Sequence, residues 1–176
     1  MIAVRDERPD DVGAIRGVVH RAFGQAEEAN LVELIRKATS ATISLVAVRR
    51  NPSDHSDVGP VVGHILFSPV TIDGGPPIAA VGLAPMAVEP THQRLGVGTA
   101  LVTAGLDRCR SLNIGVVVVL GHAEYYPRFG FQPAHQFGLS CEYDVPPEVF
   151  MAVELQAGAL DSARGIARYH EAFRSL

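Results

Sequence analysis

Two glycines separated by one residue mark the segment whose residue pattern most clearly suits a chemical function, Gln93-Arg94-Leu95-Gly96-Val97-Gly98-Thr99-Ala100. An apolar stretch precedes it and a long helical pattern follows, so the glycines are expected in the first turn of a helix. The first amides of a helix have no acceptor inside it, and the helix dipole makes that end electropositive. A phosphate could bind these amides, because Gly96 and Gly98 carry no obstructing side chain and Arg94 adds charge.

Other phosphate-binding motifs fit this segment less well. A Walker A loop requires a lysine followed by Ser or Thr, and Lys37 is the only lysine of the chain. A dinucleotide-binding pattern would require a small residue where Leu101 stands. A Gly-x-Gly pair alone is also compatible with a tight turn between a strand and a helix.

A second candidate segment, residues 124–131, places adjacent tyrosines before Pro-Arg-Phe-Gly-Phe. A phenol has a pKa of ~10 and stays protonated at neutral pH, so Tyr126 can donate a proton to a developing anion. A ring packed in the core, with its hydroxyl bonded to backbone, is the alternative. Tyr125 is the second candidate for the proton-donating role.

Hydrophobic periodicity predicts the elements that position these segments. Strands are expected at residues 1–5, 43–49, 61–72, 78–88, 114–120, 149–155 and 165–169, and helices at residues 9–23, 96–112 and 124–128. A further helix is expected after Gly24, with its apolar positions between residues 29 and 35. Pro85 must interrupt pairing of its strand, because proline cannot donate to a sheet ladder. The order strand, helix, strand over residues 78–120 predicts a right-handed βαβ unit with two parallel strands in a mixed α/β fold.

The helix expected at residues 96–112 carries enough apolar positions to lie flat on a sheet. One stripe comprises Val97, Leu101, Ala104, Arg108 and Leu112, and a neighbouring stripe comprises Val102, Leu106 and Cys109. The continuous apolar run at residues 114–120 is typical of a strand buried on both faces.

The segment Gln93–Gly98 resembles the Q/R-x-x-G-x-G/A signature of the GNAT acyltransferases, and the strand ending Gly82–Val88 resembles the fourth strand of that family. Leu120-Gly121-His122, the Tyr-Tyr-Pro-Arg-Phe-Gly-Phe motif and the tail at residues 155–160 and 169–173 are similar to the YhbS-like branch. The resemblance covers residues 1–156. It implies a GNAT acyltransferase fold, with splayed parallel strands around a central βαβ unit.

The resemblance also implies acetyl-CoA as co-substrate. Backbone groups of Met86, Ala87 and Val88 would pair with the pantetheine amides. The pyrophosphate would be held by Gln93, Arg94, Leu95, Gly96, Val97, Gly98, Thr99 and Ala100. Tyr126 would protonate the thiolate that leaves when a primary amine of a small molecule or protein attacks the thioester in a ternary complex.

The general base is not identified by this resemblance. Some members of the family carry a glutamate on the fourth strand, where this chain has Gly82, Leu83 and Ala84. Glu89, Glu124 and His122 are candidates because they follow predicted strand ends. An acceptor amine with a pKa of ~7.7–8.0 would need no strong base.

Two other functions stay open. The missing strand acid favours a non-catalytic, acyl-CoA-binding regulatory module. An acyl carrier protein could also serve as donor, although the acidity of the chain disfavours docking of an acidic carrier. The stretch 139–147 carries no chemistry that identifies an acceptor.

Composition limits the function classes further. A net charge of −4 and a pI near 5.9 argue against binding to nucleic acid or anionic membranes. No window approaches the ~20 apolar residues of a membrane span, and charged residues at 5–8 exclude a signal peptide, so a cytoplasmic location is expected. Cys109 is expected in the core, Cys141 lies in an irregular stretch, and the scattered cysteines and histidines predict no metal site.

The length of 176 residues and the lack of repeats or linkers predict one domain. Its expected boundaries are residues 1–156 for the acetyltransferase domain and 157–176 for a C-terminal extension packed on it. Either a monomer or a homodimer is compatible with the sequence.

Overall fold

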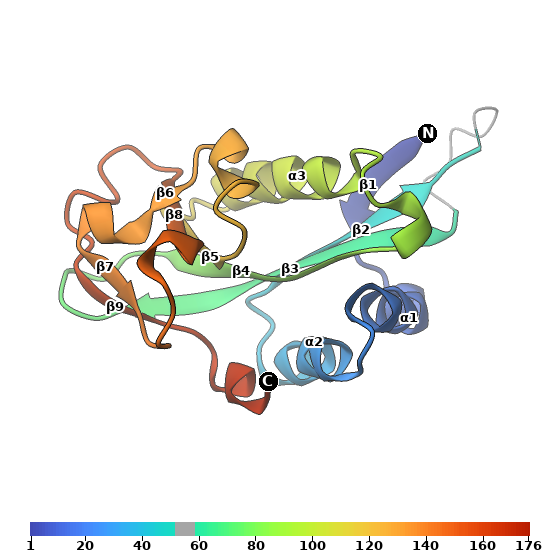
Figure 1. Cartoon of the computed structure of the whole chain (residues 1–176), viewed down its shortest axis with the longest axis horizontal. Coiled ribbons are helices and arrows are strands. Elements are labelled where there is room, and N and C mark those ends of the chain that lie inside the picture. Colours follow the sequence, from blue (N-terminus) through green and yellow to red (C-terminus); the bar gives the residue numbers. More distant parts are fainter. Residues whose placement is uncertain (52–58) are drawn as a thin grey trace. The chain divides into compact units, whose positions relative to one another are not determined.

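Figure 1 shows the elements of the computed structural model, which describes residues 1–51 and 59–176. The strands are β1 Ile2–Asp6, β2 Ile43–Arg49, β3 Val61–Ile72, β4 Ala80–Val88, β5 Val116–Leu120, β6 Gln132–Pro133, β7 Leu139–Cys141, β8 Phe150–Glu154 and β9 Gly165–Arg168. The α-helices are α1 Val12–Phe23, α2 Glu27–Ala38 and α3 Val97–Ser111. Short 3₁₀ helices lie at Pro9–Asp11, Pro90–His92, Tyr126–Phe129, Ala134–Phe137, Pro147–Val149 and Glu171–Ser175. Within these described ranges, no helix is long and apolar enough to cross a membrane.

The chain divides into two compact units, each assembled from separated segments. Unit 1 consists of Met1–Leu66, Pro85–Gly105 and Ala172–Leu176, and unit 2 of Phe67–Ala84 and Leu106–Glu171. The strands β3 and β4 and the helix α3 contribute residues to both units. The domain boundary predicted at residue 156 stays a prediction.

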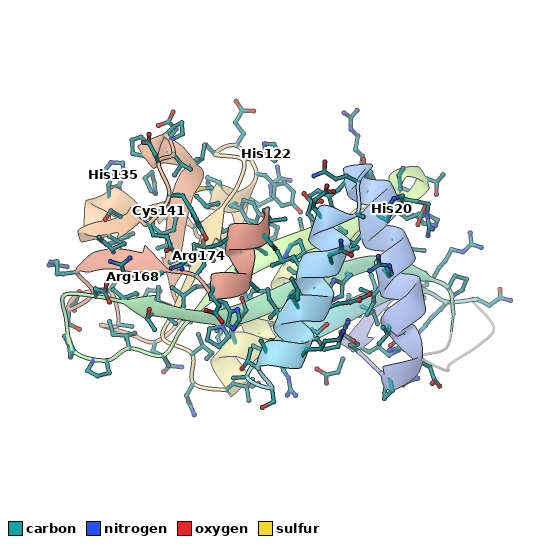
Figure 2. All side chains as sticks on the ribbon, turned by 90° about the horizontal axis from the view of Figure 1, so that it is seen from below. His20, His122, His135, Cys141, Arg168 and Arg174 are labelled. Carbon is teal, nitrogen blue, oxygen red and sulfur yellow. The ribbon has the colours of Figure 1, made fainter. Side chains whose placement is uncertain are left out.

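In unit 1, the strands follow the order β1-β2-β3-β4. β1 and β2 are antiparallel, with Ile2 opposite Arg49 and Asp6 opposite Leu45. The helices α1 and α2 lie on one face of these strands, and the first part of α3 lies on the other (Figure 1). Both α1 and α2 bury one apolar stripe, as amphipathic helices on a sheet must. The last residues, 172–176, lie beside α2 in both views and bury Phe173 (Figures 1 and 2).

An ion pair fixes the start of α1 against β1. The Arg5 guanidinium donates to both carboxylate oxygens of Asp11, from Nη1 at 2.6 Å and from Nη2 at 2.9 Å. The same carboxylate accepts the Arg8 backbone N–H at 2.7 Å, which caps the 3₁₀ turn before α1. The hydrogen bond from Arg5 holds the pKa of Asp11 below its ordinary value.

A polar cluster around the buried His64 joins the residue after β1 to β2, β3 and α2. The Ser44 hydroxyl bonds to the Glu7 carboxylate and lies 2.8 Å from Nε2 of the fully buried His64. Arg36 of α2 lies 2.8 Å from the other Glu7 oxygen. Burial lowers the pKa of His64 to about 3, so this imidazole is neutral at physiological pH. The cluster is therefore a structural network that holds α2 on the sheet.

In unit 2, β4 pairs in parallel with β5, and β8 pairs antiparallel with β5 on its other side. β6 adds to β8, β9 adds to β3 at Thr71 and Ile72, and β7 lies parallel to β9. The valines of β5, Val116–Val119, are at most 1% exposed, which confirms the strand buried on both faces. The parallel β4–β5 pair confirms the two parallel strands predicted on either side of the long helix.

The burial pattern of α3 corrects one prediction. The buried positions include Val97, Leu101 and Cys109, but Arg108 is exposed and Leu112 is 50% exposed. Leu112 cannot complete the predicted stripe because the helix ends at Ser111. The buried face follows the second predicted stripe along the C-terminal half of the helix.

Replacing Asp11 by Asn should lower the free energy of unfolding by ~3 kcal/mol, because it removes the carboxylate charge that pairs with the mostly buried Arg5 through two hydrogen bonds. Folding lowers the pKa of Asp11, so the ionised carboxylate stabilises the folded state above pH ~4. This stabilisation is lost as the pH falls through the pKa that Asp11 has in the folded protein. Chemical denaturation between pH 3 and 7 would measure both effects. Asp107→Asn is the matched control, since its pair with Arg110 is solvent-exposed and should contribute little. Equal losses for the two variants would contradict the prediction.

Candidate active site

A tight turn links the end of β4 to α3. Glu89 N–H donates to the Val62 carbonyl at 2.9 Å, and His92 N–H donates to the Glu89 carbonyl at 2.7 Å. The Gln93 side chain turns back and donates from Nε2 to the Val88 carbonyl at 3.1 Å. Gln93 thus holds the loop against the strand end, a structural task that the sequence pattern did not indicate.

The start of α3 is an open helix terminus. Arg94 and Gly96 have positive φ angles of 61° and 84°, and beyond the adjacent residues of the chain no atom lies within 4 Å of a Cβ built on Gly96. The first amide bonded within the helix is that of Ala100, which donates to the Gly96 carbonyl at 3.0 Å. The amides of residues 97–99 precede this bond, so they have no acceptor within the helix and form an electropositive end. The positive φ of Arg94 costs of order 1 kcal/mol, a strain common at ligand sites.

The residues predicted to hold the pyrophosphate differ in exposure. The exposed members are Gln93, Arg94, Leu95, Gly96 and Thr99, the half-buried members are Gly98 and Ala100, and Val97 is buried. Val97 packs on β3, where a Cβ on Gly63 would lie 3.0 Å from Val97 Cγ1 and 2.9 Å from Leu101 Cδ1. The Val97 side chain therefore anchors the helix start, and only its amide can serve a ligand.

The β4 residues predicted to pair with pantetheine alternate in exposure. Met86 and Val88 are half-buried, whereas Ala87 is 2% exposed. The parallel pairing of β4 with β5 covers Ala80–Gly82 and Val116–Val118. β4 runs on to Val88 and β5 to Leu120, so this ladder ends before either strand does.

Tyr126 lies in the 3₁₀ turn after β5 and is only 6% exposed. Its ring makes edge contacts with Tyr125 and Phe131, at centroid distances of 5.1 and 5.6 Å. No hydrogen bond of its hydroxyl is found in the described part of the chain, and that oxygen is not among the fully buried, unpaired polar atoms. Burial, with the neighbouring Tyr125, raises the pKa of Tyr126 to about 12, so the phenol stays protonated.

The Tyr126 ring occupies the space next to Gly121. A Cβ built on Gly121 would lie 2.8 Å from Tyr126 Cδ2, and closer still to Cε2. The turn is closed by Gly130, whose φ of 92° ends the 3₁₀ helix and whose N–H donates to the Pro127 carbonyl. Arg128 braces the turn from outside by donating to the Tyr125 carbonyl at 2.8 Å and covering the Tyr125 ring.

Comparison with known proteins identifies the family. The model of the acetyltransferase (GNAT) domain matches residues 3–134. The uncharacterized N-acetyltransferase YhbS of Escherichia coli strain K12 is 34% identical over 170 residues, which are 97% of both chains.

The chain belongs to the GNAT acetyltransferase family.

Solved structures agree with this assignment. The crystal structure of E. coli YhbS in complex with CoA has a TM-score of 0.89 at 34% identity and covers 98% of this chain and 92% of its own. A GNAT family acetyltransferase from Brucella melitensis, in complex with acetyl-CoA, has a TM-score of 0.77 at 33% identity and covers 98% of both chains. The predicted GNAT fold and acyltransferase class are therefore confirmed.

The candidate bases of this acetyltransferase are not equally available. Arg21 donates three hydrogen bonds of 2.9 to 3.1 Å to the Glu89 carboxylate, and these hold the pKa of Glu89 below its ordinary value. Glu89 is therefore a poor proton acceptor. His122 follows β5 and is exposed (Figure 2), and its carbonyl accepts the Tyr125 N–H at 3.0 Å. Glu124 is also exposed, and both side chains stay candidates.

The cysteines of the acetyltransferase are both free. Cys109 is fully buried in α3, as predicted, and burial raises its pKa to about 12. Cys141 is half-buried on β7, beside the β9 residues 167 and 168 (Figure 2), and burial also raises its pKa. Among residues 1–51 and 59–176, no cluster of three or more His, Cys, Asp or Glu residues could hold a metal.

Sequence reasoning missed a group of side chains around Gly82. The Tyr169 ring lies directly over this glycine. The centroid of the Tyr143 ring lies 6.1 Å from the centroid of the Tyr169 ring. Glu142, in a stretch that carried no readable chemistry, accepts the Tyr169 N–H at 2.6 Å. A glycine inside a buried strand was the available signal, because such a glycine often marks a close approach of another group.

The contact between Gly121 and Tyr126 yields a test of the turn geometry. Gly121→Ala should push the Tyr126 ring out of place and lower the free energy of unfolding by ~1–3 kcal/mol. In a Tyr126→Ala background the same substitution should cost much less, because the obstructing ring is gone. Thermal unfolding of the four proteins in this double-mutant cycle would measure the coupling. Additive losses would show that the two residues do not collide.

Proposed function

We propose that this chain is an N-acetyltransferase that transfers an acetyl group from acetyl-CoA to a primary amine of a small molecule or protein. The amine attacks the thioester directly, in a ternary complex. The observation that carries the proposal is the open, glycine-lined start of α3, in a chain similar over nearly its full length to GNAT proteins crystallised with CoA and acetyl-CoA.

In the proposed complex, the diphosphate of acetyl-CoA binds at the start of α3. Amides at residues 96–99 and the exposed Arg94 offer donors and positive charge to one anion, whereas the Ala100 amide is already bonded to the Gly96 carbonyl. The free space around Gly96 supports this use, because phosphate oxygens can approach the backbone there. Gln93 supports the loop through its bond to the Val88 carbonyl.

In the same proposed complex, the pantetheine arm pairs with β4. Backbone groups of Met86, Ala87 and Val88 lie beyond the last parallel pair of β4 with β5, at Gly82 and Val118. The Val88 carbonyl already accepts from Gln93, and β4 pairs with β3 on its other side. Groups on the β5 side that have no ladder partner require other hydrogen bonds, and the two amides of pantetheine can supply them.

In the proposed reaction, Tyr126 protonates the leaving group, the thiolate of CoA. The lone pair of the amine attacks the thioester carbonyl, the carbon–sulfur bond breaks, and the thiolate takes the phenolic proton of Tyr126. The proton lost by the amine passes to solvent or to an exposed base, and it balances the proton that Tyr126 later regains. The hydroxyl of Tyr126 suits this role because no protein acceptor competes for its proton in the described part of the chain.

The acceptor follows from the missing strong base. Gly82, Leu83 and Ala84 carry no acid, and Glu89 is held ionised by Arg21. An amine that is partly unprotonated at neutral pH, such as an α-amino group with a pKa of ~7.7–8.0, fits this site better than a lysine side chain with a pKa of ~10.4. The same observation favours a second candidate, an acyl-CoA-binding regulatory module. Tight acetyl-CoA binding without CoA release across a broad panel of amines would support that candidate.

Gly98→Glu should weaken acetyl-CoA binding at least ~100-fold, because it brings a carboxylate into the proposed phosphate site. Calorimetric titration would measure this loss against the native protein, for which binding on the order of micromolar is expected. Gly13→Glu is the matched control, because it makes the same change at an exposed glycine of α1 with open space around it. Unchanged binding by Gly98→Glu would remove the α3 terminus from the proposal.

Tyr126→Phe should lower CoA release by ~100-fold and leave acetyl-CoA affinity within a few fold, because only the proton donor is lost. Since the pKa of Tyr126 is about 12, the pH dependence of the native enzyme below pH 9 should report the amine and not this phenol. Tyr125→Phe is the control, and it should keep nearly full activity. A loss in Tyr125→Phe alone would transfer the role to that residue.

A further inference from the structure

The parallel ladder between β4 and β5 ends at one pair of residues. The last parallel partners are Gly82 and Val118, and both strands continue beyond them. If the pantetheine arm pairs with residues 86–88, as the proposed function holds, its thioester points back along β4 toward Gly82. The atoms around Gly82 then decide how large an acyl group can be.

The Tyr169 ring covers Gly82. A Cβ built on this glycine would lie 2.5 Å from Tyr169 Cε1, 3.0 Å from Tyr169 Cδ1 and 3.0 Å from Val70 Cγ2. The ring therefore uses the space that the missing side chain leaves. Tyr169 is 8% exposed.

Several contacts keep this ring in place. Tyr169 follows β9, which pairs with β3 at Thr71 and Ile72. Its backbone N–H donates to Glu142 Oε1 at 2.6 Å, and its ring centroid lies 6.1 Å from that of Tyr143. A side chain held at both backbone and ring has few ways to move aside for a longer acyl chain.

We infer that Tyr169 forms the end wall of the acyl site and limits the donor to short acyl groups. The inference rests on the proposed function and deepens it, since it concerns the acyl group of the same donor. Tyr169 lies outside the segment matched by the family model, residues 3–134. The C-terminal segment thus supplies a specificity-determining residue to a site otherwise built from β4 and β5.

The test compares affinities for CoA, acetyl-CoA and butyryl-CoA by calorimetry, which needs no knowledge of the acceptor. The native protein should bind acetyl-CoA more tightly than butyryl-CoA. Tyr169→Ala should shift the ratio of the two affinities about tenfold toward butyryl-CoA, because two more methylenes find an apolar space. Affinity for CoA itself should stay within twofold.

Three further variants separate this effect from general loosening. Tyr169→Phe keeps the ring and should keep the native ratio. Tyr169→Leu should shift the ratio in the same direction by a smaller factor, and it serves if Tyr169→Ala does not fold. Phe173→Ala removes another buried ring from the same C-terminal segment and should leave the ratio unchanged.

The two proposals fail in different ways. If the native protein binds no CoA, the proposed function and this inference are both overturned. If CoA binds tightly but Tyr169→Ala and Tyr169→Leu keep the native ratio, only the role of Tyr169 is overturned. A shift of equal size in Phe173→Ala would also overturn it, because the effect would then not depend on the ring over Gly82.

Discussion

The early end of the β4–β5 ladder is the constraint on which the candidate site depends. The parallel strands β4 and β5 pair only as far as Gly82 and Val118, although both continue. Backbone groups inside a protein must be bonded to something, so such an interruption is costly unless another partner completes it. Pro85, which cannot donate, lies in β4 beyond its last pair with β5 and removes one backbone donor from that part of the strand. A ligand with amides of its own suits the remaining groups.

Glycines let large side chains approach the strands closely. Gly63 admits Val97 and Leu101 in unit 1, and in unit 2 Gly82 admits the Tyr169 ring. Gly121 does the same for Tyr126 at the end of β5. Because each of these glycines has no side chain, a neighbouring side chain packs directly against its backbone. The positions of the Tyr169 and Tyr126 rings thus depend on glycines, one in β4 and one just after β5, that perform no chemistry themselves.

The sequence predicted what depends on neighbours along the chain. β2 and β3 have the predicted bounds, since their apolar β-branched runs end at clear turn signals. The glycine-rich start of α3 and the Tyr126 turn were found because each is defined by residue types at a local spacing. The sequence did not predict the contact of the Tyr169 ring with Gly82 or the ion pair between Arg21 and Glu89, because each joins residues far apart in the chain. No local pattern indicates which carboxylate an arginine will meet.

The two cysteines have a practical consequence for how turnover can be followed. A buried thiol with a pKa of about 12, such as Cys109, is almost entirely protonated at pH 8 and reacts slowly with disulfide reagents. The raised pKa of Cys141 reduces its thiolate fraction as well. A chromogenic disulfide that counts released thiol would therefore meet a protein with little background colour. Each molecule of CoA set free could be read directly, without alkylating the enzyme beforehand.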